Sequence, residues 1–98
     1  MPARDPLSDD QIDAALPDGW RRQSGSDGSQ IERQFSFGDF REAFGFLTRV
    51  AFEAEGMEHH PEISNVYNMV HLALSTHDAD DRVTEMDLAL AQRINALL

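Results

Sequence analysis

The sequence predicts an α+β domain, in which a four-stranded antiparallel sheet carries three helices packed on one face in the order α-β-β-α-β-β-α. Three observations support this fold class. Two pairs of short alternating segments are joined by turn residues, three helical segments begin with capping residues, and 98 residues suffice for one two-layered core. We therefore expect a single domain over residues 1–98, with residues 1–7 flexible.

The first helix and the first hairpin follow from local signals near the start of the chain. Ser8 and Gln11 have the spacing of a capping box, so a short helix is expected to begin at Asp9 and to end at Pro17. The segments that follow alternate around a glycine-rich and serine-rich turn. We expect a strand at 20–23, a turn at 24–29 and a strand at 30–37, with Arg33 as the one polar residue on its apolar face.

The second helix is the longest predicted element. Asp39 with Glu42 forms a cap signal, and the helix should run for about sixteen residues to the region of Gly56. The residues expected to face the sheet follow helical spacing: Phe40, Ala43, Phe44, Leu47, Ala51 and Ala54. Three further apolar residues lie outside this stripe: Phe46, Val50 and Phe52. They indicate either wider burial or a helix-mediated contact between copies of the chain.

The second hairpin and the last helix complete the pattern. Residues 63–67 and 69–77 read as two strands joined by a tight turn around Asn68. Thr84 and Asp87 form a second capping box, which opens the last helix. Because the helices cover one face of the sheet, the other face is expected to be open to a ligand or a partner.

The charge of the chain limits its partners. The formal net charge is −10, with eight arginines and no lysine, which disfavours nucleic acid because binding to a phosphate backbone needs a basic surface. No run of eighteen apolar residues and no apolar leader is present, so we expect no membrane partner and a cytoplasmic location. The absence of cysteine excludes disulfides and thiolate sites.

The four histidines suggest chemistry, and a metal site is the first interpretation to test. His71 and His77 lie six residues apart on one predicted strand, roughly 20 Å at 3.3 Å per residue, which is too far to share an ion. The acidic loop after His77 lacks the calcium-binding pattern. The sequence also lacks the nucleophile elbow that would indicate a serine hydrolase. We therefore expect no metal.

Proton transfer fits these residues better, since imidazole titrates near neutral pH. His59 and His60 are adjacent, and Pro61 favours an extended conformation at His60. If the second hairpin pairs through its tight turn, His77 comes to the end of the sheet where the histidine pair lies. All three imidazoles would then meet at one end of the sheet.

Two segments carry a resemblance to a known family. "EHHPEISNVYNMVHLALSTHD" is similar to the signature of pterin-4a-carbinolamine dehydratases, and "FGDFREAFGFLTRVAFEAEGM" resembles their long helix. The resemblance covers about residues 8–97. It implies a hydro-lyase that removes water from 4a-hydroxytetrahydropterin to give quinonoid dihydropterin during pterin recycling. It further implies that pterin is the substrate and that no other cofactor is required.

By the same resemblance, His59, His60 and His77 are the catalytic histidines, with His60 as the acid at the 4a-hydroxyl. Glu55 is implied to orient a histidine. Other residues that bind or orient the substrate are Glu58, Pro61 and Asp87, although the capping box alone gives Asp87 a sufficient structural role. Three departures from the family concern the pocket: Ile63 where tryptophan is common, Met86 in place of arginine, and a longer loop at 78–83.

The resemblance also implies self-association and leaves the function open in one respect. Family members form homodimers or homotetramers through sheet edges and the long helix, here with Phe46, Val50 and Phe52 as candidate contacts. Two alternatives to the recycling enzyme remain. One is a binding module similar to a coactivator that acts through its long helix, and the other is a dehydratase in another pterin pathway, such as molybdopterin metabolism.

Overall fold

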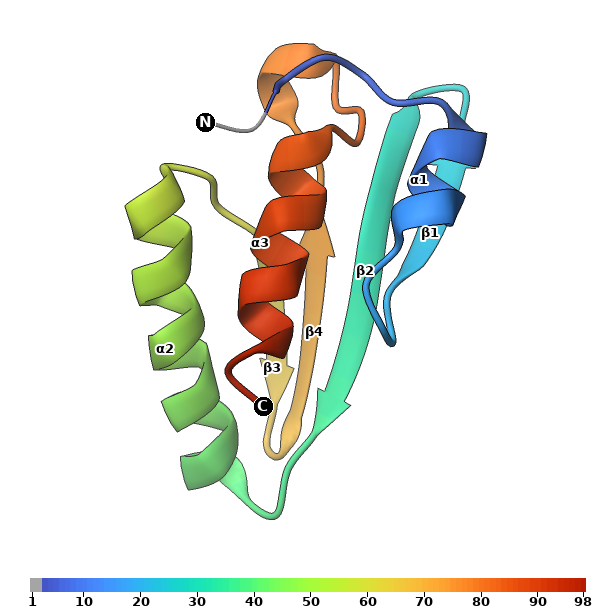
Figure 1. Cartoon of the computed structure of the whole chain (residues 1–98). Coiled ribbons are helices and arrows are strands. Elements are labelled where there is room, and N and C mark those ends of the chain that lie inside the picture. Colours follow the sequence, from blue (N-terminus) through green and yellow to red (C-terminus); the bar gives the residue numbers. More distant parts are fainter. Residues whose placement is uncertain (1–2) are drawn as a thin grey trace.

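The computed structural model describes residues 3–98 and confirms the predicted fold class (Figure 1). Four antiparallel strands form one sheet in the order β1-β2-β4-β3. The elements are α1 (Asp9–Ala15), β1 (Arg21–Gly25), β2 (Gly28–Ser36), α2 (Phe40–Met57), β3 (Glu62–Val66), β4 (Met69–Leu74), a short 3-10 turn (His77–Ala79) and α3 (Glu85–Asn95). The flexibility expected for residues 1–7 concerns, in part, residues 1–2, which lie outside the described residues.

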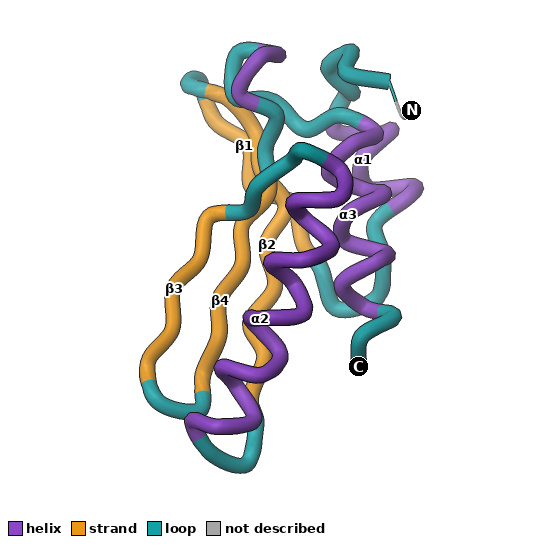
Figure 2. Tube along the Cα trace, turned by 90° about the vertical axis from the view of Figure 1, so that its left-hand side faces the viewer, coloured by secondary structure: helices purple, strands orange, loops and turns teal. Residues whose placement is uncertain are grey.

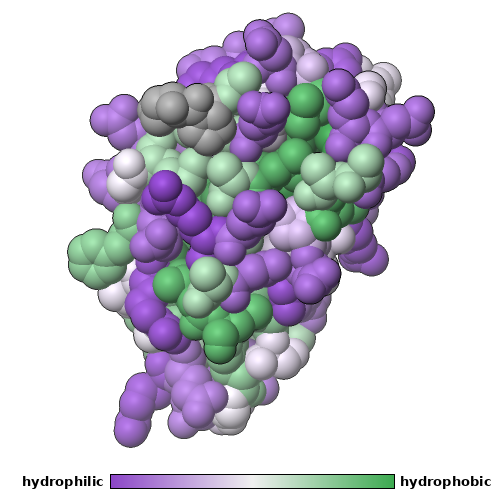
Figure 3. Space-filling model, in the orientation of Figure 1, coloured by the Kyte–Doolittle hydropathy of each residue, from purple (hydrophilic) through white to green (hydrophobic). Residues whose placement is uncertain are grey.

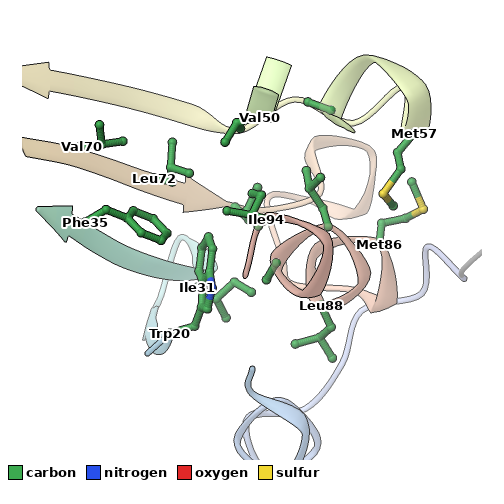
Figure 4. Close-up of a cluster of buried hydrophobic side chains, with 14 of the residues drawn as sticks. Trp20, Ile31, Phe35, Val50, Met57, Val70, Leu72, Met86, Leu88 and Ile94 are labelled. Atoms are coloured by element: carbon green, nitrogen blue, oxygen red, sulfur yellow. The ribbon is translucent and has the colours of Figure 1, made fainter. Parts of the chain in front are cut away.

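Figure 2 shows the sheet on one side of the molecule and the helices on the other. The helix-facing side of the sheet is apolar, and Figure 4 shows its side chains packed against α2 and α3. The sheet contributes Ile31, Phe35, Val70, Leu72 and Leu74 to this core, each less than 5% exposed. Within residues 3–98, no helix is both long enough and apolar enough to cross a membrane.

All three predicted helix starts are confirmed. Ser8 forms a capping box with Gln11, Asp39 accepts the backbone N–H of Glu42, and Thr84 forms a capping box with Asp87. Each cap satisfies N–H groups that the first helical turn leaves without a partner inside the helix. These local bonds explain why the starts could be predicted from spacing alone.

The predicted face of α2 is correct for Ala43, Leu47 and Ala54, which are buried, but it is wrong for the other three residues. Phe40 and Phe44 are 48% and 53% exposed, and Ala51 is exposed as well, whereas Phe46 and Val50 are fully buried. The helix carries two apolar stripes, both with helical spacing. Phe46 packs against Phe35 and Phe37, with ring centroids 4.9 and 5.0 Å apart. The aromatic side chains of β2 therefore decide which stripe faces the sheet, and neither Phe46 nor Val50 can form an interface.

Arg33 breaks the apolar face of β2 for a structural reason. Its Nη1 donates to the backbone carbonyl of Asp18 at 2.7 Å and to Oδ1 of Asn95 at 2.9 Å. Its guanidinium also lies 4.8 Å from the ring centroid of Phe35. Arg33 thus ties the turn before β1 to the carboxyl end of α3, where the helix dipole favours a positive charge.

The strand boundaries differ from the predictions at both hairpins. At the first hairpin, β1 continues to Gly25 and β2 begins at Gly28, so only residues 26–27 remain of the turn expected at 24–29. β4 ends at Leu74 instead of continuing to His77, and beyond it Thr76 makes only an isolated bridge to Arg82. His77 begins the 3-10 turn. The chain leaves the sheet here because the 77–82 segment folds back onto the start of β2, where the carbonyl of Asp81 accepts the N–H of Ser29 at 3.0 Å.

Candidate active site

Figure 1 places the carboxyl end of α2, the 3-10 turn and the start of α3 at the same end of the sheet. α2 ends through Glu58, which adopts a left-handed conformation and donates its N–H to the carbonyls of Ala54 and Glu55. The reversal directs the next two side chains into different environments. His59 is 6% exposed, whereas the side chain of His60 is 65% exposed.

His59 is paired with a buried carboxylate. Its Nε2 lies 2.5 Å from Oδ1 of Asp87, which is fully buried at the start of α3. The other carboxylate oxygen, Oδ2, accepts the hydroxyl of Thr76 at 2.8 Å and the backbone N–H of Thr84 at 2.9 Å. Asp87 is therefore both the capping residue that the sequence predicted and a partner of His59, and only the first of these contacts follows from spacing.

His60 faces outward beside Glu55, with its Nε2 2.8 Å from Oε1 of that glutamate. It lies between two hollows. The larger, of about 470 Å³, is apolar, and its lining includes Phe52, Pro61 and Ile63. The smaller, of about 120 Å³, lies toward the open face of the sheet, and its lining includes Gln30, Glu62 and Ser75. The structure thus places the predicted orienting residues Glu55 and Pro61 next to His60, and both line the larger hollow with it.

His77 lies on the exposed 3-10 turn, where its side chain is 93% accessible. Its Nδ1 is 2.9 Å from Oδ1 of Asp81, a contact between residues four apart that sequence reasoning missed. The turn is held closely, because a Cβ at Gly28 would lie 2.3 Å from the carbonyl oxygen of Asp81. Asp80 and Asp81 both have positive φ, 59° and 57°, a conformation that aspartate tolerates better than most residues.

The hydrogen bond from His77 to Asp81 raises the pKa of His77, and the negative charges of Asp81 and Asp78 add to this effect. We predict that Asp81→Asn lowers the pKa of His77 toward its ordinary value, which NMR titration of the ring carbons measures. Because the pKa of His77 is higher in the folded state than in the unfolded state, the contact with Asp81 contributes its full stabilisation at pH values below 6.5. That stabilisation is lost as the pH rises through the folded pKa of His77.

Asp78→Asn is the matched control, since Asp78 acts on His77 through its charge alone. It should move the midpoint less than Asp81→Asn does. Equal midpoints for the wild type and Asp81→Asn would show that the contact with Asp81 does not hold the proton on His77.

Each of the three histidines thus has a carboxylate partner of its own. No hydrogen bond joins any two of them among residues 3–98. Within the same residues, no group of three or more histidine, cysteine, aspartate or glutamate side chains is arranged to hold a metal ion. Three imidazoles paired with carboxylates at one end of a sheet provide groups that can donate and accept protons.

The fold places the chain among small two-layered α+β proteins with histidine–carboxylate pairs at one end of the sheet. The family model of pterin 4 alpha carbinolamine dehydratase matches residues 5–97. A protein of Mesorhizobium japonicum, provisionally named pterin-4-alpha-carbinolamine dehydratase, is 50% identical over 92 residues, which are 94% of this chain and 93% of that protein. The chain therefore belongs to the pterin-4a-carbinolamine dehydratase family.

Two solved structures resemble this fold. A transcriptional coactivator/pterin dehydratase from Brucella melitensis matches with a TM-score of 0.85 and 40% identity, over 95% of this chain and 98% of that one. A pterin dehydratase-like protein described as a RuBisCO assembly factor in the α-carboxysome matches with a TM-score of 0.67 and 26% identity, over 81% of this chain and 88% of that one. The family fold is therefore found in proteins described by more than one function.

Proposed function

We propose that this protein removes water from 4a-hydroxytetrahydropterin to give quinonoid dihydropterin, as a step in the recycling of a pterin cofactor. The observation that carries the proposal is the position of His60, an accessible imidazole that Glu55 orients at the border of two hollows. Family membership supports the same substrate class. A cytoplasmic location is part of this proposal, because the substrate is a small water-soluble molecule.

The reaction needs two proton transfers. The 4a-hydroxyl must be protonated to leave as water, and the proton on N5 must go to a base as the double bond forms. His60 is the proposed acid and acts as the doubly protonated imidazolium: its Nε2–H donates to Glu55, and its Nδ1–H gives its proton to the 4a-hydroxyl. His59 and His77 bind the pterin or take up the second proton. This chemistry requires neither a metal nor a redox cofactor.

The direct test follows the absorbance of 4a-hydroxytetrahydropterin that a hydroxylase generates during the assay. The wild-type protein should accelerate the decay of this absorbance, and the double variant His59→Ala/His60→Ala should not. The double variant must be shown to be folded by circular dichroism, since His59 is buried. A folded wild type that leaves the decay unchanged would contradict the proposed function.

A second function, binding through α2, is favoured by the exposed phenylalanines of that helix. Phe44 and Phe52 are 53% and 74% exposed on its outer face, and Figure 3 shows hydrophobic patches between hydrophilic side chains on the helix side of the molecule. This surface would serve a binding module that needs no histidine. Activity in the pterin assay that survives in Phe44→Ser would separate the two functions, since Phe44 lines neither hollow beside His60.

We further propose that copies of the chain associate through α2 and the sheet edge formed by β3. β3 is an outer strand, and Ile63 and Val66 on it are 49% and 72% exposed. Of the three helix residues predicted for this contact, only Phe52 remains available, because Phe46 and Val50 are buried. Whether the assembly is a homodimer or a homotetramer stays open.

We predict that Phe52→Ser weakens self-association by about tenfold or more, because an exposed aromatic side chain at the centre of an interface contributes strongly to affinity. Light scattering over a dilution series measures the effect. Leu98→Ser is the matched control, as it removes an exposed apolar side chain at the end of the chain. Only an 11 kDa monomer at micromolar wild-type concentration would contradict self-association.

A further inference from the structure

A series of buried, hydrogen-bonded side chains, two hydroxyls and one carboxylate, lies behind His59. Thr76, Thr84 and Asp87 are each at most 1% exposed, and they lie at the junction of α2, β4 and α3. Their surroundings are apolar, and Figure 4 shows Met57 of α2 and Met86 of α3 pointing toward one another across this junction. A carboxylate in such a place is costly unless each oxygen has donors.

The direction of each hydrogen bond in this series follows from the carboxylate of Asp87. An ionised Asp87 only accepts, so Thr76 donates its hydroxyl proton to Oδ2 at 2.8 Å. Thr84 must then donate its own hydroxyl proton to Oγ1 of Thr76, 2.6 Å away. The backbone N–H of Met86 in turn donates to Oγ1 of Thr84 at 3.2 Å. Every group has one orientation.

A capping role does not account for Thr76. The cap needs only the bond from the N–H of Thr84 to Oδ2 of Asp87. Thr76 lies two residues beyond the end of β4 and is as deeply buried as Leu72 and Leu74 of that strand, so another apolar side chain would be expected there. Its backbone is fixed as well, since its N–H donates to the carbonyl of Arg82 and its carbonyl accepts the N–H of Ala79.

The ring of His59 is the last group in this series of hydrogen bonds. Oδ1 of Asp87 accepts the Nε2 proton, so in the neutral ring Nδ1 carries no proton. Among residues 3–98 no buried side-chain nitrogen or oxygen lacks a hydrogen-bond partner, and Nδ1 of His59 is bonded to none of these residues. Nδ1 is therefore not fully enclosed by these residues, and it is the ring nitrogen that is left for a ligand.

From this geometry we infer that Thr76 is a positioning residue, whose hydroxyl orients Asp87 so that His59 presents an unprotonated Nδ1 as a proton acceptor. The inference deepens the proposed dehydratase function and rests on it for the identity of the proton donor, the N5–H of the pterin. The orientation of His59 itself does not depend on the substrate.

The test compares Thr76→Val, which keeps the shape of the side chain but removes the hydroxyl, with Thr76→Ser, which keeps the hydroxyl. Long-range proton–nitrogen NMR spectra of the His59 ring report which nitrogen carries the proton. We expect the proton on Nε2 in the wild type and in Thr76→Ser, and a mixture of the two neutral forms in Thr76→Val. A Thr76→Val protein that is folded and has the wild-type spectrum would overturn the inference.

Activity gives a second comparison. kcat of Thr76→Val should fall by about 10- to 100-fold, if its loss matches that found when the hydrogen-bond partners of metal-bound histidines are removed. KM should stay within about twofold, because Thr76 does not touch the ligand, and Thr76→Ser should restore kcat. If the wild type lacks dehydratase activity while Thr76→Val still changes the His59 spectrum, the proposed function fails and the positioning role stands.

If Thr76→Val does not fold, the wild-type protein alone can test the role of Thr76. The hydroxyl proton of Thr76 should then be visible as a slowly exchanging resonance, since it is buried and bonded to Asp87. A hydroxyl proton that exchanges rapidly, or a neutral His59 with its proton on Nδ1, would overturn the inference.

Discussion

Replacing His60 by alanine will slow dehydration by about 10²- to 10⁴-fold, the contribution typical of a positioned acid or base. The expected loss is in kcat, since the 4a-hydroxyl would then have to take its proton from water. The fold should be unaffected, because the side chain of His60 is 65% exposed and its bonded partner, Glu55, is 79% exposed. Stopped-flow absorbance with generated 4a-hydroxytetrahydropterin measures the rate, and a thermal melt checks the fold.

The control for this variant is His71→Ala. His71 lies in the middle of β4 on the open face of the sheet, with Nε2 3.5 Å from Oε2 of Glu32. His71→Ala removes an imidazole that is 38% exposed, and His71 lines neither hollow beside His60. Turnover close to wild type in His60→Ala, or an equal loss in both variants, would show that His60 is not the acid.

Replacing Asp87 by alanine will lower the free energy of unfolding by about 3–5 kcal/mol, as expected when one partner of a buried pair is removed. The loss has three sources. The N–H of Thr84 and the hydroxyl of Thr76 both lose their hydrogen-bond acceptor. The ring of His59 is left in a buried site without its carboxylate partner. Urea denaturation with wild type and variant measures the difference.

Asp39→Ala is the matched control, because Asp39 caps α2 at an exposed position and bonds only to the N–H of Glu42. Its loss should cost about 1 kcal/mol, the value typical of a cap. The comparison separates the two roles of Asp87. If Asp87→Ala costs no more than Asp39→Ala, the bonds to Thr76 and His59 contribute nothing to stability.

Local signals predicted much of this fold. Ser8, Asp39 and Thr84 begin helices because each cap bonds to residues two or three positions away, and such contacts are visible in the spacing. Hairpins are likewise determined by neighbouring residues. The face of α2 could not be predicted in this way, because both of its stripes have helical spacing. Phe35 on β2 and Phe37 directly after it select the stripe that contains Phe46.

The candidate site likewise combines features that the sequence predicted with contacts between distant residues that it did not predict. The resemblance implied that Glu55 orients a histidine, which in the structure is His60, and the capping box predicted the position of Asp87. The bond between His59 and Asp87 joins residues 28 positions apart and exists only because α2 and α3 dock side by side. Thr76 and Asp81 depend on where β4 ends, and the predicted strand ran past that point.

Pro61 has a consequence for the free edge of the sheet. It stands directly before β3, and a proline has no N–H to donate to a neighbouring strand. A second chain that adds to this edge can pair along residues 62–66 but loses its next partner at Pro61, one residue short of His60. The proline therefore ends the stretch of the edge to which a second strand can add, and the backbone of His60 lies beyond that stretch.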